Sequence, residues 1–139
     1  MTPTLTLELA ATDVAGVTRA RQAITEYAER LGLDTDVRDR VRLAITEACA
    51  NCVLHAYDGA SAHSTYRVDA HMDTDALVVV VEDWGEGLEG HGDTPDAAKL
   101  SGLGQGLKLI QALASTVEIT SGVGRGTRIR MQFDRTSLV

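Results

Sequence analysis

The order of apolar and polar residues predicts a short strand, then two long helices, then a region made mostly of strands. Alternation with a period of two is typical of a strand with one buried face, and Leu5–Leu9 and Tyr66–Met72 both show it. The apolar, β-branched run from Leu77 to Val81 predicts a central strand covered on both faces. The complete set of expected strands is residues 5–9, 66–72, 77–81, 117–121 and 127–133.

Apolar residues that recur every three or four positions predict the helices. The first begins at a cap residue, Asp13, and ends at Gly32, where a left-handed backbone is favoured. Its apolar face is expected to hold Val14, Val17, Ala20, Ile24, Tyr27, Ala28 and Leu31. A second helix is expected from about Thr35 to Tyr57, and a short one over residues 107–114. This order predicts an α+β fold, a two-layer sandwich of a mostly antiparallel, mixed sheet with helices packed on one face.

The second predicted helix carries polar residues on an unexpected side. Glu47, Asn51 and His55 are four residues apart, so they form one narrow stripe along the helix. Its apolar flanks are Leu43 and Leu54 on one side and Val37, Val41 and Ala48 on the other. The expected solvent face, opposite the stripe, is Arg38, Asp39, Arg42 and Thr46. The stripe is therefore predicted to point toward the body of the fold.

Two interpretations of this stripe remain open on the sequence alone. Buried polar groups are usually satisfied by hydrogen bonds, so the stripe is explained by a polar core or by contacts to a neighbouring loop. It is equally explained by a ligand pocket, in which Glu47 supplies a base and Asn51 a neutral oxygen for a hard cation that also touches phosphates.

Glycine clusters follow the central strand. Asp83 ends that strand before Gly85 and Gly87, and its carboxylate is suited to accept the exocyclic amine of adenine. Three more glycines precede the short helix, where exposed N–H groups favour phosphate; they are Gly102, Gly104 and Gly106. The last cluster, Gly122–Gly126, is explained by a hairpin turn alone, although Thr127 follows it.

The glycine pattern at residues 85–90 matches a dinucleotide-binding motif but lacks its context. That motif requires a helix to begin at once, whereas residues 91–95, with sequence HGDTP, predict a loop. A phosphate-binding loop of the G-x-x-x-x-G-K-[ST] type is also absent from the sequence.

Taken together, these segments resemble the boxes of the Bergerat-fold ATPases, which include gyrase, sensor histidine kinases and bacterial anti-sigma factor serine kinases. ITEACANCVLHAY, from Ile45 to Tyr57, is similar to the N box, and DWGEG, from Asp83, to the D-x-G-x-G box. GQGLKLI, from Gly104, resembles the second glycine box, and Gly126 with Thr127 the last. The His and Ala-Tyr that follow the Asn are most similar to the anti-sigma factor kinases.

The resemblance implies a role for each matching residue. Glu47 would be the catalytic base, Asn51 would ligate Mg²⁺ on the phosphates of ATP, and Asp83 would bind the adenine amine with support from Thr127. The other implied nucleotide-binding residues are Gly85 and Gly87 at the base pocket, and Gly102, Gly104, Gly106 and Leu107 at the phosphates.

The same resemblance implies that the chain phosphorylates an anti-anti-sigma protein, also binds a sigma factor, and forms a homodimer. Two function classes stay open: a protein serine/threonine kinase that is also an anti-sigma factor, and a catalytically silent ATP-binding module that sequesters a protein. The presence of both Glu47 and Asn51 favours the kinase, because a pure binding module would tolerate their loss.

Some side chains carry no assignment. Lys99 lies in the implied lid, residues 89–101, and either reaches a phosphate or is solvated. Cys49 and Cys52 lie within the second helix, where core packing explains them better than a redox pair or a zinc site. His55 has no assigned role.

Composition excludes several other functions. The chain has 139 residues and 14.8 kDa, the size of one domain, expected to span residues 1–139. Its net charge of −7 argues against direct binding to nucleic acid or to anionic membranes. With two cysteines and no basic, apolar leader, a cytoplasmic location is expected.

Overall fold

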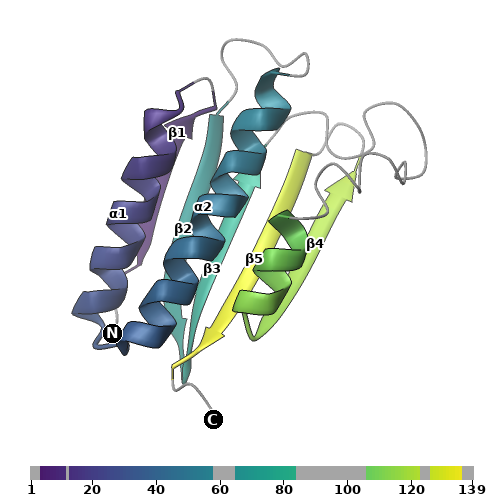
Figure 1. The fold of residues 1–139 in the computed structure, drawn as a ribbon. Coiled ribbons are helices and arrows are strands. Elements are labelled where there is room, and N and C mark those ends of the chain that lie inside the picture. Colours follow the sequence, from purple (N-terminus) through teal and green to yellow (C-terminus); the bar gives the residue numbers. More distant parts are fainter. Residues whose placement is uncertain (1–3, 12, 58–64, 84–105, 123–125, 136–139) are drawn as a thin grey trace.

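The described strands form one five-stranded sheet, and the helices lie on one of its faces (Figure 1). The computed structural model describes residues 4–11, 13–57, 65–83, 106–122 and 126–135. Its labelled elements are β1 (Leu5–Ala10), α1 (Ala15–Arg30), α2 (Thr35–Tyr57), β2 (Thr65–Asp73), β3 (Ala76–Asp83), β4 (Thr116–Gly122) and β5 (Gly126–Asp134). A further helix covers residues 106–113. The predicted α+β architecture is thus confirmed.

The strand order β1-β2-β3-β5-β4 puts the most apolar strand, β3, at the centre. All neighbouring pairs are antiparallel. Residues 76–81 are all buried, as expected for a central strand. Leu77, Val79 and Val81 belong to the core beneath the helices, together with residues of α1 and α2.

Both faces of β3 are buried, as predicted, although the helices of the described part of the chain cover only one of them. α1, α2 and the helix over residues 106–113 all lie on the same side of the sheet (Figure 1). Val78 and Val80 belong to the opposite face and are still buried, at 0% and 8% exposed. Their strand neighbours include His71, Gln132 and Arg130, whose longer side chains flank these valines on the adjacent strands.

The helix α1 begins one residue later than a cap at Asp13 implies. Val14 holds the N-cap position without a side-chain cap, and the Asp13 carboxylate accepts a hydrogen bond from the N–H of Ala15 at 3.0 Å. Val14 is 62% exposed, so its predicted place on the apolar face is wrong. Val14 has right-handed helical backbone angles, φ −62° and ψ −31°, so it is exposed because no described element covers this end of the helix and not because its direction differs.

The end of α1 is as predicted. Gly32 has φ +77°, a left-handed conformation that glycine adopts without a steric penalty. The N–H of Gly32 donates to the carbonyl of Glu29, and the N–H of Leu33 donates to that of Ala28. This pair of bonds is the Schellman motif, which reverses the chain toward α2.

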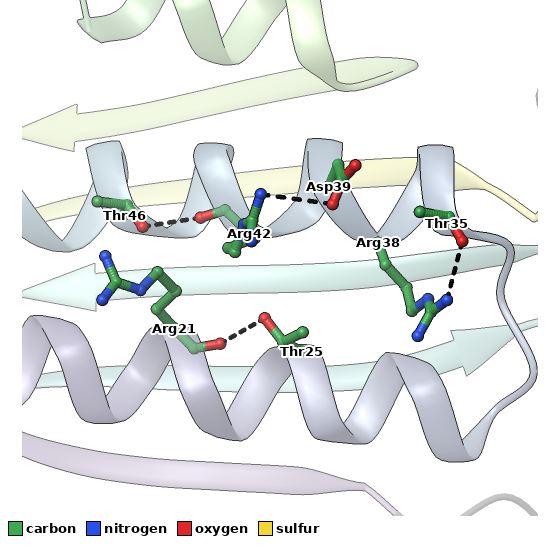
Figure 2. Close-up of polar contacts among 7 residues, drawn as sticks. All are labelled: Arg21, Thr25, Thr35, Arg38, Asp39, Arg42 and Thr46. Atoms are coloured by element: carbon green, nitrogen blue, oxygen red, sulfur yellow. Dashed lines mark hydrogen bonds and ion pairs between the residues drawn. The ribbon is translucent and has the colours of Figure 1, made fainter.

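The helix α2 has the predicted bounds, and its first turn is capped by Asp34, whose carboxylate accepts from the N–H of Val37 at 2.9 Å. The predicted outer face carries local polar contacts, several of them drawn in Figure 2, and one longer contact to α1, between Arg38 and Glu29 at 3.9 Å. Arg42 pairs with Asp39 at 3.4 Å, and Arg38 donates to the hydroxyl of Thr35 at 3.0 Å.

The predicted apolar flank of the stripe is wrong at Leu43, which is 46% exposed. Leu43 lies one turn before Glu47, and this side of α2 is only half covered, since Glu47 and Asn51 are themselves partly buried.

Within the described residues, no helix is long and apolar enough to cross a membrane.

Candidate functional site

Four segments far apart in the sequence meet at one end of the sheet. These are the C-terminal half of α2, the end of β3, the start of β5 and the start of the helix over residues 106–113 (Figure 1). The six sequence-predicted site residues that the structure describes all lie on these segments: Glu47, Asn51, Asp83, Gly106, Leu107 and Thr127.

Glu47 and Asn51 are directed at the first residue of the helix over residues 106–113. A Cβ atom built on Gly106 would lie 3.3 Å from Oε2 of Glu47 and 3.5 Å from both Oδ1 and Nδ2 of Asn51. Such a contact with Oε2 is tighter than nine in ten real Cβ contacts. Glycine at this position therefore lets the helix start close to the two polar side chains.

Asn51 has hydrogen-bonding capacity that the described residues do not use. Its Nδ2 is buried without a hydrogen-bond partner among them. A buried amide of this kind costs free energy unless a ligand, a water or another group satisfies it. The described part of α2 thus presents an unsatisfied amide and a carboxylate one helical turn apart.

This donor set fits Mg²⁺ held together with phosphates. Mg²⁺ prefers oxygen ligands, keeps several waters, and is usually bound through one or two protein groups plus substrate phosphates. The described residues contain no group of three His, Cys, Asp or Glu side chains that would hold a metal alone. Asn51 would supply its Oδ1, and the remaining ligands would come from the nucleotide and water.

Asp83 and Thr127 form the second half of the site. They are directly opposite in the β3–β5 register, and Asp83 Oδ1 accepts a hydrogen bond from the Thr127 N–H at 3.3 Å. Thr127 is the one polar residue among the described residues that is classed as buried, at 7% exposed. The carboxylate is therefore oriented from β5 while it remains partly exposed at the strand end.

Two cysteines of α2 lie above this end of the sheet. Burial, together with the negative charge of the Asp83 carboxylate, raises the pKa of Cys52 well above its usual value. Burial raises the pKa of Cys49 to about 12, beside the hydroxyl of Tyr66. Both are free and buried, which confirms the predicted core packing.

The effect of Asp83 on the pKa of Cys52 was not predicted from the sequence. The available signal was its position: Cys52 follows Asn51 directly and lies on the helix face that packs on the strand ending in Asp83. Gly85, Gly87, Gly102, Gly104 and Lys99 lie outside the described residues, and so does the side chain of His55. Leu107 is partly buried and packs against the core.

Comparison with known proteins identifies the family. The family described as a histidine kinase-like ATPase domain matches residues 10–133. The serine-protein kinase RsbW of Halalkalibacterium halodurans is 30% identical over 113 residues, which cover 75% of this chain and 68% of that protein. An anti-sigma F factor of Caldanaerobacter subterraneus is 26% identical over 117 residues, covering 81% and 80%.

Solved structures share the fold. The RsbU and RsbW domains of a Mycobacterium tuberculosis protein superpose with a TM-score of 0.72 at 22% identity, covering 95% of this chain. This chain spans only 32% of that one. The SiaB–SiaC complex from Pseudomonas aeruginosa contains a chain that superposes with a TM-score of 0.67 at 16% identity, covering 93% of this chain and 89% of that one.

Proposed function

This chain belongs to the histidine kinase-like ATPase domain family, in the branch of bacterial anti-sigma factors and serine-protein kinases, and we propose that it is an ATP-dependent protein serine/threonine kinase. It transfers the γ-phosphate of ATP to a hydroxyl of an anti-anti-sigma protein. It is also an anti-sigma factor, so that phosphorylation of one partner decides which partner is held.

The observation that carries the proposal is the placement of Glu47 and Asn51 against Gly106. A module that only binds nucleotide needs no carboxylate there. Glu47 forms no ion pair with any described residue, so its carboxylate is available to a substrate hydroxyl. The silent-module alternative therefore leaves this carboxylate unexplained.

Each residue has a distinct part in the reaction. Glu47 accepts the proton of the attacking serine or threonine hydroxyl as the new O–P bond forms and the bond to ADP breaks. Asn51 would supply an oxygen ligand to Mg²⁺, and the metal would supply positive charge that stabilises the transferred phosphoryl group. Asp83 accepts the exocyclic amine of adenine, with its carboxylate oriented by the N–H of Thr127. Gly85 and Gly87 at the base, and Gly102, Gly104, Gly106 and Leu107 at the phosphates, complete the proposed nucleotide site.

The partner proposals follow from relatives named anti-sigma F factor and serine-protein kinase. We propose an anti-anti-sigma protein as substrate, a sigma factor as the sequestered partner, and a homodimer as the working form in the cytoplasm.

The direct test is incubation of the purified chain with Mg²⁺ and γ-labelled ATP, together with candidate partners encoded nearby. Label on a partner serine or threonine is the expected result. Tight, nucleotide-dependent binding without transfer of label would contradict the kinase proposal and select the silent module.

Replacement of Gly106 by Ala is expected to weaken binding of Mg·ATP by about tenfold, a loss of about 1.4 kcal/mol. The new methyl group would lie 3.3 Å from Oε2 of Glu47, which would have to shift by a few tenths of an ångström, and would be in ordinary contact with the Asn51 amide. The free energy of unfolding of the free protein is expected to stay the same or to rise, because Ala has a higher helix propensity than Gly, by up to about 1 kcal/mol. Isothermal titration with Mg·ATP and thermal unfolding of the free protein measure the two effects.

The matched control is Gly32→Ala. Gly32 has open space around its Cβ direction but a left-handed backbone, so Ala there is expected to lower stability and to leave the affinity for Mg·ATP unchanged. Equal affinities of the wild type and the Gly106→Ala variant would contradict the crowding argument.

A further inference from the structure

We propose that Leu43 and Leu109 dock the protein substrate beside its phosphate-accepting hydroxyl, by binding an aliphatic side chain of that substrate. The inference rests on the proposed function, because it deepens the same reaction. It names the surface on which the substrate protein lies and the chemistry of the side chain that this surface accepts. Neither leucine has a part in the mechanism above.

Exposed large hydrophobic side chains are few in the described part of the chain. They are Val14, Leu43, Leu109 and Ile119. Leu43 is 46% exposed on α2, and Leu109 is 38% exposed on the helix over residues 106–113. Single exposed apolar residues are ordinary on protein surfaces and need no explanation. The positions of Leu43 and Leu109 relative to Glu47 set these two apart from that background.

Both leucines lie one helical turn from the contact between α2 and the helix that Gly106 begins. Leu43 precedes Glu47 by four residues, and Leu109 follows Gly106 by three. Residues spaced in this way are neighbours on one helix surface, with Cβ atoms about 5–6 Å apart. Glu47 and Gly106 are themselves close, since a Cβ built on the glycine would lie 3.3 Å from Oε2. The two leucines therefore flank the residues that meet there.

The directions of the two helices put both leucines on the same side of this contact. α2 runs toward the end of the sheet that carries the site, whereas the helix over residues 106–113 starts at that end and runs away from it (Figure 1). One turn back along α2 and one turn forward along the other helix are thus displacements in the same direction. Leu43 and Leu109 consequently lie at the same level of the helical layer, next to the carboxylate of Glu47.

The occupant of this surface follows from the reaction proposed for Glu47. A general base must come within hydrogen-bonding distance of the hydroxyl that it deprotonates. The hydroxyl of serine or threonine is joined to its own backbone through a single carbon, so the substrate chain must pass within a side chain's length of the carboxylate. Residues next to the acceptor are thereby brought onto the helix surfaces around Glu47. An aliphatic side chain among them buries apolar surface against Leu43 and Leu109, which a charged one does not.

The experiment uses, as its probe, the purified partner that accepts label in the transfer experiment above. Leu43→Gln and Leu109→Gln are each expected to raise KM for this partner about 5- to 20-fold, because each removes apolar contact area, and to leave kcat unchanged. The dissociation constant for Mg·ATP is expected to stay at the wild-type value, since neither side chain belongs to the nucleotide site. In the partner, Ala in place of the docked aliphatic residue, found by replacing in turn those within about four positions of the labelled residue, is expected to raise KM for the wild type but not for Leu43→Gln.

The matched control is Val14→Gln. Val14 is 62% exposed at the start of α1, and α2 lies between α1 and the helix over residues 106–113 (Figure 1). This variant also removes an exposed apolar side chain, and it is expected to leave KM and kcat unchanged. Leu43→Met keeps an apolar side chain of similar volume and is expected to keep the KM of the wild type.

Unchanged KM for the partner in both glutamine variants would overturn the inference. So would an equal rise of KM with Val14→Gln, since it would show that any exposed apolar residue has this effect. A change from dimer to monomer in Leu43→Gln at unchanged KM, measured by sedimentation, would also overturn it and assign the surface to contact between copies of this chain. Absence of label on any partner would instead overturn the proposed function, so the two failures are distinguishable.

Discussion

Replacement of Glu47 by Gln is expected to slow phosphate transfer to the protein substrate by about 10²- to 10⁴-fold, the usual contribution of a general base. The amide has nearly the same shape, so the close approach of this side chain to Gly106 is retained. ATP affinity is expected to stay the same or to rise slightly, because a negative charge near the phosphates is removed. Single-turnover transfer from γ-labelled ATP and titration with Mg·ATP measure the two quantities separately.

Asp39→Asn is the control for the loss of one negative charge on the same helix. Asp39 lies on α2, paired with Arg42 at 3.4 Å (Figure 2), and is two helical turns before Glu47. Exposed pairs of this kind contribute little to stability, so this variant is expected to transfer phosphate at the wild-type rate. Wild-type transfer by the Glu47→Gln variant would show that another group accepts the proton.

The elements that the sequence predicted well are those whose signal is local. The bounds of α2 follow from a long helical period, and the end of α1 follows from the conformational freedom of Gly32. Leu43 and Val14 were predicted wrongly for a shared reason. Helical spacing predicts the face of the helix on which a residue lies. It does not predict how far along the helix neighbouring elements cover that face.

In the site, too, the local features were predicted and the long-range contacts were not. The stripe of Glu47 and Asn51 was visible in the sequence, because both residues lie on one helix. Its contact with Gly106 agrees with the glycine box before the short helix. Asp83 ends a strand whereas the stripe lies on a helix, and the separation of the two is set by packing that no local pattern encodes.

Asn51→Ala is expected to abolish the Mg²⁺-dependent part of the stabilisation that ATP gives to the folded protein. A ligand present at 100 times its dissociation constant stabilises by about 2.7 kcal/mol. For a domain of this size, such a change corresponds to a rise in Tm of roughly 8–10 °C. Thermal unfolding with ATP, with and without Mg²⁺, measures how much of that rise each variant keeps.

The free Asn51→Ala variant is expected to be at least as stable as the free wild type, which makes the comparison clean. Nδ2 of Asn51 is buried without a partner among the described residues, so removing the amide there leaves no donor or acceptor stranded. Chelation of Mg²⁺ in the wild type should reproduce the shift seen with the variant. An Asn51→Ala variant whose Tm still rises with Mg·ATP as in the wild type would rule out Asn51 as the metal ligand, and the buried amide would then be part of a polar core.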